Sequence, residues 1–529
     1  MRKILSILIG VGMVAGGCEV GPNYTPPKVT VLRDWGERGM EPTTKPSATT
    51  QTSRTTSSMP IVDWWKTFHD PLLNDLVKRA VAENLDLKRA TSRLREARAE
   101  RGVVQADLYP EVDASGSYQH ARVSKNGVAS AFGGGGSGAV NAGGGGQSPP
   151  GANGSPAIPG SELSEFNLYQ AGFDASWEID VFGGKRRAVE AASAEIQAAV
   201  EDQRDVLTTL LAEVARNYLE LREGQHRVAI AQKNLEAQQK TVELTRELAR
   251  QGLTNELDLS RAQAQVATTA SQVPGLETDV SQAIHRLSVL LGERPTALAE
   301  ELTKEGDLPG VPDEVPVGLP SELLRRRLDV RRAERMIAVA TARVGMATAD
   351  LFPKFTLNGS VGLQSLQPGD LASWDSRFYS IGPGISWPIF DAGKIHNQIH
   401  VQEAREDQAI LAYRQVVLTA LKEVEDALVA YDKTQQRVAA LRDAVEAERK
   451  AVRISNDLYK QGLTDFLSVL DAERTLYASE DGLAAGEGEI ATSLVALYKA
   501  LGGGWEIDRQ NRSLTSQIEE VPARDLRAD

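Results

Sequence analysis

The chain has 529 residues, of which 41% are hydrophobic and 25% charged, and its formal net charge is -13. This is the composition of a folded chain rather than a disordered one, and the acidic balance argues against a nucleic acid as partner. Beyond the N-terminus no apolar run approaches the roughly 20 residues of a membrane helix, so any membrane-spanning part must consist of strands.

The N-terminus has the features of a secretory signal. Arg2 and Lys3 precede a short apolar stretch that ends in small residues directly before Cys18. A charged start, a short apolar region and a small-residue cleavage site are typical of a signal peptide. Cys18 is the only cysteine, so no intrachain disulfide can form. The segment resembles a bacterial lipoprotein signal, and we expect loss of residues 1–17 and acylation, for example with palmitate, at Cys18. An ordinary signal peptide with an incidental cysteine is the alternative.

Three further segments are predicted to lie outside the packed core. Residues 18–62 contain a long run rich in Thr and Ser, typical of a tether behind the anchor. Residues 127–160 are rich in Gly, Ser and Pro and predict a long loop. No Lys-Ser/Thr pair follows these glycines, which argues against a phosphate-binding loop. Residues 505–529 form a polar C-terminal tail.

An internal repeat divides the rest of the chain into two copies, residues 63–310 and 311–504. Matching residues lie 210 positions apart after the glycine-rich segment and 243 apart before it, so the first copy carries 33 extra residues. The matched positions are Gly252 with Gly462, Trp177 with Trp387, and Pro110 with Pro353.

Each copy contains two segments in which apolar and polar residues alternate. They cover residues 112–119 and 169–178 in the first copy, and 355–364 and 379–387 in the second. Alternation with a period of two over about ten residues predicts strands with one apolar face. Tyr and Trp near their ends suit a membrane interface. A soluble half-buried sheet could explain any one strand, but four strands in two matched hairpins favour a membrane barrel.

The remainder of each copy is predicted to be helical. Residues 185–250 contain no proline, and their apolar residues recur at steps of four and three, the spacing of a coiled-coil seam. This helix would be about 100 Å long at about 1.5 Å per residue. We expect the long helices to end at Gly252 and Gly462. The seam residues are Leu207, Leu211, Val214, Tyr218 and Leu221; the other predicted helices cover residues 255–291, 465–501, 72–108 and 321–351.

The chain resembles a known group of proteins, the outer-membrane factors of tripartite efflux systems. These form the TolC-like superfamily, and the match is to its OprM/NodT-type lipoprotein branch. The resemblance runs from the anchor to the tail. Two departures are a longer glycine-rich loop and Leu328, which stands where the family usually has proline. The residues that carry the resemblance are Val20–Tyr24, Trp64–Trp65, Trp177–Gly184, Trp387–Gly393, Leu470–Arg474 and Leu501–Trp505.

The resemblance implies a homotrimer in the bacterial outer membrane. A chain with four strands leaves edges that cannot face lipid, whereas three chains supply 12 strands, which lies within the known range of closed barrels. The fold class expected is therefore mainly α, with a long coiled-coil barrel crossing the periplasm and four β-strands per chain. The implied function is a passive exit duct for small molecules. The implied partners are outer-membrane lipid, a periplasmic adaptor protein and an inner-membrane RND pump.

Two other functions remain open from the sequence. One is an exit duct for type I protein secretion, and the other is a structural coiled-coil envelope lipoprotein that conducts nothing. An enzyme is not expected, and neither is a cofactor, since neither a Gly-x-Ser-x-Gly nor a Gly-x-x-x-x-Gly-Lys motif occurs. His396 and His400 lie one helical turn apart, but a solvated polar face is favoured over a metal site there.

A cluster of arginines before the second hairpin is interpreted as a solvated helix surface, because acids are interleaved with it. The arginines are Arg325, Arg326, Arg327, Arg331 and Arg332, and the acids are Asp329 and Glu334.

The resemblance places a gate near the two helix breaks, Gly252 and Gly462. It implies that Asp471 matches the acidic pore ring of the family and Leu467 its apolar constriction. Asp258 and Tyr459 match residues that link neighbouring helices in the closed state. An exposed acid near a helix start, favoured by the helix dipole, is the alternative for Asp471.

Two departures weaken the expected ionic links of this gate. Ser468 stands where some members have a second aspartate, and Thr464 where some have an arginine.

Overall fold

The computed structural model describes residues 19–27, 35, 54–56, 62–122, 165–304, 306–312, 314–318 and 320–506. The predicted signal peptide, Cys18, the glycine-rich loop and all of the tail beyond Glu506 lie outside the described residues.

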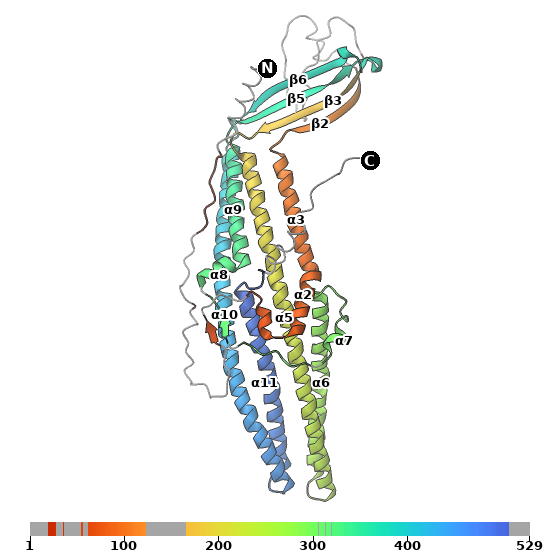
Figure 1. The fold of residues 1–529 in the computed structure, drawn as a ribbon, viewed down its shortest axis with the longest axis vertical. Helices are drawn as coiled ribbons and strands as arrows, with labels where there is room; N and C mark the ends of the chain where they lie inside the picture. The colour runs from red at the N-terminus through yellow and green to blue at the C-terminus, as the bar shows by residue number, and fades with distance from the viewer. Residues whose placement is uncertain are drawn as a thin grey trace. The chain divides into compact units, whose positions relative to one another are not determined.

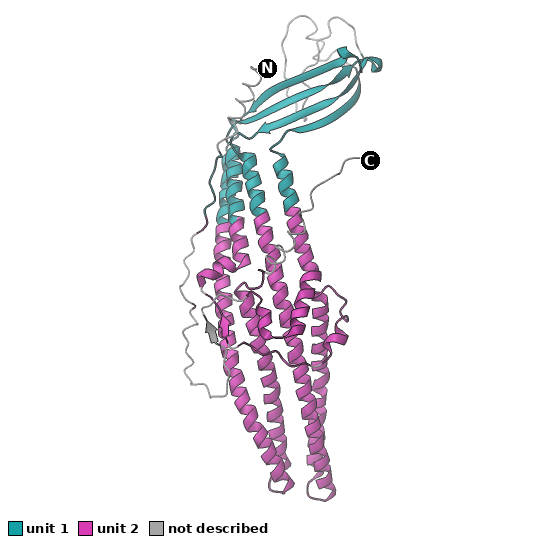
Figure 2. Cartoon of the chain, in the orientation of Figure 1, with its two compact units in different colours: residues 1–25, 98–195, 337–408 teal, residues 26–97, 196–336, 409–529 magenta. Residues whose placement is uncertain are grey.

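The chain divides into two compact units (Figure 2). Unit 1 comprises residues 1–25, 98–195 and 337–408, and unit 2 comprises residues 26–97, 196–336 and 409–529.

Unit 1 contains a four-stranded antiparallel sheet in the order β2-β3-β5-β6 (Figure 1). The sequence predicted all four strands, and their observed bounds are Glu111–Arg122 for β2, Glu165–Ile179 for β3, Lys354–Ser365 for β5 and Arg377–Ser386 for β6. β2 and β3 form one hairpin, β5 and β6 form the other, and β3 pairs with β5 between them. Two short 3-10 turns, η3 (Pro368–Asp370) and η4 (Trp374–Ser376), lie between β5 and β6.

One face of this sheet carries a row of exposed apolar side chains. Phe173 of β3 pairs with Val361 of β5, which pairs with Tyr379 of β6, and paired residues in an antiparallel sheet point to the same side. All three are exposed, Tyr379 by 84%. Exposed apolar residues that share this face suit contact with an apolar environment rather than with water.

The first described residues of the chain are held against α5 (Gly184–Arg250) within unit 1. Arg187, which is 2% exposed, donates from Nη2 to Oδ1 of Asn23 at 2.7 Å and from Nε to the carbonyl of Val20 at 3.3 Å. Gly21 has a φ of +89°, and a Cβ there would clash with the backbone of Gly345. The residues that follow Cys18 are therefore fixed in place rather than free.

The helices carry the rest of the chain. α5 (Gly184–Arg250) and α10 (Lys394–Lys460) have 67 residues each, and α6 (Glu256–Leu290) and α11 (Phe466–Ala500) have 35 each. Among the described residues, no helix combines the length and the apolar character needed to cross a membrane. The other elements are η2 (Trp64–Phe68), α2 (Pro71–Glu83), α3 (Leu85–Ala106), α7 (Ala299–Leu302), α8 (Pro320–Arg326), α9 (Leu328–Ala349), and the short parallel pair β1 (Arg54–Thr56) and β4 (Glu314–Pro316).

The predicted seam on α5 is buried in unit 2. Leu207 is 4% exposed, and Val214, Tyr218 and Leu221 are 0% exposed. The spacing of four and three residues thus identified the inward face of the helix correctly.

Two predicted helices are each broken in two. The helix expected over residues 72–108 stops at Asn84, whose Nδ2 donates to the carbonyl of Leu290 at 2.8 Å while its Oδ1 accepts from the amide of Leu87. The helix expected over residues 321–351 stops at Arg327. Both breaks occur where a side chain bonds to backbone far away in the sequence.

The arginine cluster was wrongly interpreted as a solvated surface. Arg327 is 9% exposed and pairs with Asp329 at 2.7 Å and Glu423 at 2.6 Å, and it also donates to the carbonyl of Ala500. Arg326 pairs with Glu506 at 2.8 Å and is also largely buried. The acids beside these arginines neutralise buried charge, and only some of the cluster faces water.

The end of α11 and the C-terminal motif pack against η2 in unit 2. The ring of Trp64 stacks on Tyr498 at 5.4 Å. Gly504 has a φ of +104°, and a Cβ there would clash with Leu211 and crowd Trp64. Trp505 is 5% exposed and lies below the guanidinium of Arg204 at 4.9 Å. Two motifs more than 400 positions apart therefore form one core.

Candidate functional site

The two turns predicted at Gly252 and Gly462 lie at the same end of unit 2 (Figure 1). Gly252 has a φ of +73° and Gly462 one of +72°. The amide of Leu253 bonds back to the carbonyl of Leu248, and that of Leu463 to the carbonyl of Leu458. This is the Schellman ending, in which glycine takes the left-handed position without a Cβ penalty. Both glycines thus lie in the turns that follow the ends of α5 and α10.

The helices that leave the turns begin with capped N-termini. Asn255 accepts from the amide of Asp258 at 2.9 Å at the start of α6. Asp465 accepts from the amide and the hydroxyl of Ser468 at the start of α11, and these bonds lower the pKa of the Asp465 carboxyl. Each cap satisfies backbone donors that the first turn of a helix leaves open.

A small apolar core joins all four helices next to the turns. Tyr459 of α10 is 6% exposed, and its ring lies 5.6 Å from that of Phe466 of α11. Val242 of α5 and Leu259 and Ala262 of α6 complete the contact, together with Val469 and Leu470. The two helical hairpins are therefore packed together at the turns rather than independent.

Two of the predicted site residues are connected at this core. The hydroxyl of Tyr459 donates to Oγ1 of Thr254 at 3.5 Å, and Thr254 donates to Oδ2 of Asp258 at 2.8 Å. Arg261 also lies 3.8 Å from the Asp258 carboxylate. Tyr459 and Asp258 thus meet through a third residue, which the sequence had not singled out for this role.

The other two predicted site residues face solvent in this chain. Leu467 is 52% exposed, and Asp471 lies on the same exposed face of α11, one turn further along. In the part of the chain that the structure describes, no ion pair engages the Asp471 carboxylate. This chain alone therefore brings neither residue to the Tyr459–Thr254–Asp258 connection.

Buried acids on α11 form a polar layer that sequence reasoning missed. Glu473 accepts from the hydroxyl of Thr241 on α5 at 2.7 Å, and its pKa is raised by burial. Glu480, one heptad later, accepts from Asn234 at 3.0 Å and pairs with Arg449 at 2.8 Å. Two acids seven residues apart on the inward seam of a helix were the available signal.

The same layer contains a bidentate salt bridge between α5 and α11. Arg227 donates to both carboxylate oxygens of Asp481, at 2.8 and 3.1 Å. Glu223 lies one turn earlier on α5, and burial raises its pKa to about 7. A Cβ on Gly488 would clash with this carboxyl, so the glycine on α11 makes room for it.

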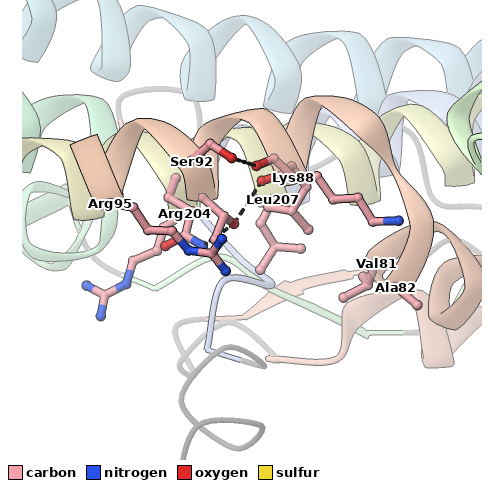
Figure 3. Close-up of a pocket in the computed structure, with 10 residues that line it drawn as sticks. Val81, Ala82, Lys88, Ser92, Arg95, Arg204 and Leu207 are labelled. Carbon is pink, nitrogen blue, oxygen red and sulfur yellow. Dashed lines mark hydrogen bonds between the residues drawn. The ribbon is translucent and has the colours of Figure 1, made fainter. Parts of the chain in front are cut away.

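A cavity of about 370 Å³ lies elsewhere in unit 2, between α2, α3 and α5 (Figure 3). Lys88, Arg95 and Arg204 give it a basic lining. Arg204 is already engaged, because it pairs with Glu201 at 3.1 Å and covers Trp505. None of the predicted site residues lines this cavity.

His396 and His400 both lie near the start of α10. Nδ1 of His400 contacts Glu403 at 2.9 Å, and within the described ranges no three His, Cys, Asp or Glu side chains are grouped to hold a metal ion.

Comparison with known proteins decides the family. The chain matches the outer membrane efflux protein family over residues 76–293 and 319–503. It belongs to this family. Nodulation protein T of Rhizobium leguminosarum bv. trifolii is 29% identical over 502 residues, covering 93% of this chain and 96% of that protein. The pyoverdine export outer membrane protein OpmQ of Pseudomonas aeruginosa is 30% identical over 450 residues, covering 85% and 89%.

A solved structure agrees with this membership. That of the outer-membrane channel OprN is 36% identical and superposes with a TM-score of 0.79, covering 92% of this chain and all of that one. The resemblance drawn from the sequence is confirmed. The efflux protein is an outer-membrane channel that works with an efflux pump, and it is a transport duct rather than an enzyme.

Proposed function

We propose that three copies of this efflux protein form one passive exit duct for small molecules, closed by a 12-stranded barrel and continued by a coiled-coil tube. The observation that carries the proposal is the sheet of unit 1, whose edge strands β2 and β6 each pair on one side only within the described residues. Open edges do not occur in lipid. In this arrangement the two sequence copies, residues 63–310 and 311–504, supply one hairpin each.

Native mass spectrometry in detergent tests the assembly, and planar-bilayer recording tests conduction. We expect three chains per particle and discrete channel openings. A stable monomer with full β signal would contradict the trimer. A trimer that passes no ions would instead support a structural role for the protein.

The proposed partners are a periplasmic adaptor protein and an inner-membrane RND pump, which would drive the cargo through the duct. The support is membership in a family whose members work with efflux pumps. Cross-linking in cells, followed by identification of the proteins that co-purify, tests the assignment. Recovery of the efflux protein alone after cross-linking would argue against these partners.

Acylation of Cys18 is the proposed membrane anchor. The residues just after it are held by Arg187, which would keep an attached lipid close to unit 1. Intact-mass analysis of the mature protein should show loss of residues 1–17 and the mass of acyl chains. An unmodified thiol on a mature N-terminus would rule out the anchor.

The proposed gate lies at the two turns. In a trimer, Leu467 and Asp471 would each form a ring of three on the inner face, as an apolar constriction and a charged one. Asp258 and Tyr459 would hold the two helical hairpins of each chain together in the closed state. The support is the exposure of the first pair and the connection of the second pair through Thr254.

A further inference from the structure

The free edges of the sheet in unit 1 call for a specific partner. The outer sides of β2 and β6 carry backbone donors and acceptors that the four-stranded order leaves without a neighbouring strand among the described residues. Such an edge is a template for another strand. In the proposed trimer that strand comes from a second copy of the chain, but the trimer alone does not fix the register of the pairing.

The two hairpins obey the same offsets as the sequence repeat. In the first hairpin Gly116 pairs with Ala171. Advancing Gly116 by 243 positions and Ala171 by 210 leads to Gly359 and Ile381, which is an observed pair of the second hairpin. The offsets read from sequence motifs therefore convert one observed register into the other with no adjustment.

The same offsets can be applied to the pairing of β3 with β5 within one chain, and they then give a pairing of β6 with β2 between two chains. Gly172 of β3 pairs with Gly362 of β5. Advancing Gly172 by 210 gives Gly382 in β6, and moving Gly362 back by 243 gives Gln119 in β2. We infer that β6 of one copy pairs antiparallel with β2 of the next, with Gly382 opposite Gln119. This inference rests on the proposed trimer and adds its register.

The side chains of the two edges agree with this register. It places Pro383 opposite Tyr118 and Ile385 opposite Gly116 on the apolar face, and Ser386 opposite Ser115 on the polar face. A slip of one residue in either direction would instead set Pro383 and Ile385 opposite polar residues of β2, whereas the pairs nearer the far end of β2, Ile381 with His120 and Tyr379 with Arg122, do not discriminate. A register shifted by two residues would keep apolar residues opposite apolar ones. Only the repeat argues against such a shift, so the experiment must distinguish registers that differ by two residues.

Cysteine cross-linking has that resolution. Directly opposite residues lie about 4.5–5.5 Å apart between Cα atoms, and diagonal neighbours about 7–8 Å. A disulfide needs about 4.4–6.8 Å and is strained beyond this. Gly382 accepts a cysteine, because a Cβ there meets nothing within 4 Å. Chains that carry Gly382→Cys are co-expressed with differently tagged chains that carry Gln119→Cys.

The matched controls replace Gln119→Cys by Ser117→Cys or Ala121→Cys, which lie two residues away on the same face. The unaltered chain, whose only cysteine is Cys18, is the blank. We expect the Gly382 and Gln119 pair to give at least about tenfold more linked dimer than either control, because the strain of a diagonal bridge amounts to several kcal/mol.

Each combination is first shown to assemble under reducing conditions by native mass spectrometry. Trimers that link preferentially through Gln119→Cys support the inferred register. Trimers that link equally well or better through Ser117→Cys or Ala121→Cys, or through none of the three, overturn the register but leave the trimer standing. Monomers without any linked product overturn the trimer itself, and the register with it.

Discussion

Tyr459 of α10 and Asp258 of α6 are joined through one side chain, that of Thr254. The two contacts differ in strength, because 3.5 Å is long for a bond between hydroxyls whereas 2.8 Å is ordinary. Most of the stabilisation by Tyr459 must therefore come from its buried ring against Phe466. The hydroxyl adds a link between the two helical hairpins that can be removed separately.

Tyr459→Phe should separate the link from the packing. We expect its stability to fall by no more than about 1 kcal/mol, since one long hydrogen bond is lost. If the link holds the gate, the variant should nevertheless leave the resting channel more open and sensitise cells to large antibiotics. Thr254→Val should have the same effect, whereas Phe466→Leu disturbs the packing alone. Unchanged resting conductance in both link variants would show that Tyr459 acts only through its ring.

Glu223 should make the stability of the efflux protein fall as pH rises. Its folded-state pKa of about 7 lies above the unfolded value of 4.5. The protonated carboxyl therefore favours the folded state below about pH 4.5, and this advantage is lost as pH rises through 7. Glu223→Gln should thus be more stable than the natural chain at pH 8, by about 2 kcal/mol, and nearly equal to it near pH 4.5.

Thermal unfolding in detergent at several pH values measures this difference. Glu243→Gln is the matched control, since its side chain is 71% exposed on the same helix. A gap between Glu223→Gln and the natural chain that does not widen with pH would mean that the carboxyl is already charged in the fold.

The parts of the fold that the sequence predicted are those set by short-range periodicity. The alternation around Phe173 and the seam through Tyr218 depend only on neighbours along the chain. The breaks at Asn84 and Arg327 were missed, because neither residue is a helix breaker. Each ends a helix through a bond to a distant carbonyl, that of Leu290 or of Ala500.

The candidate site likewise combines residues with a local sequence signal and residues whose role depends on tertiary contacts. Glycines at the turns are a local signal, and both were predicted. Asp258 and Tyr459 were identified from the family resemblance. The role of Thr254 as the link between them could not be predicted, because it depends on which helices of the two halves of the chain are neighbours. The pore roles of Leu467 and Asp471 remain predictions, because a ring on the axis exists only in the assembly.

The burial of Arg327 predicts a large cost for its removal. Arg327→Ala would leave Asp329, Glu423 and the carbonyl of Ala500 without their partner. We expect a loss of about 3–5 kcal/mol, as for other buried pairs that lose one member. Arg332→Ala is the control, since this arginine is 46% exposed and pairs with Asp202, and it should cost at most about 1 kcal/mol. Urea unfolding followed by circular dichroism compares them, and equal costs would refute the role of burial.

Two glycines that end helices should differ in their tolerance of alanine. Gly252 and Gly292 have nearly the same φ, +73° and +75°. A Cβ on Gly252 meets nothing within 4 Å, whereas one on Gly292 would lie 2.8 Å from the carbonyl oxygen of Glu83. Gly252→Ala should therefore cost only the backbone strain, about 1 kcal/mol, and Gly292→Ala distinctly more. The melting temperatures of the two variants measure this difference in stability. A larger drop in melting temperature for Gly252→Ala than for Gly292→Ala would contradict the expectation.

The pore assignment makes the sharpest prediction about transport. A ring of three carboxylates in a narrow passage favours cations, so Asp471→Ala should weaken cation selectivity. Leu467 lies one turn earlier on the same face, and Leu467→Ala should widen an apolar constriction and raise single-channel conductance.

The repeat supplies a matched control for this prediction. Leu257 lies 210 positions before Leu467 and is 55% exposed, against 52% for Leu467, at the corresponding place on α6. Truncation of either leucine removes the same exposed surface, so their folding costs should be alike, but only Leu467→Ala is expected to change conductance. Planar-bilayer recordings of the single variants compare reversal potentials and conductance. Equal conductance changes for both leucines would place the constriction on both helices. Unchanged selectivity in Asp471→Ala, with unchanged conductance in Leu467→Ala, would leave Asp471 as an exposed acid near a helix start.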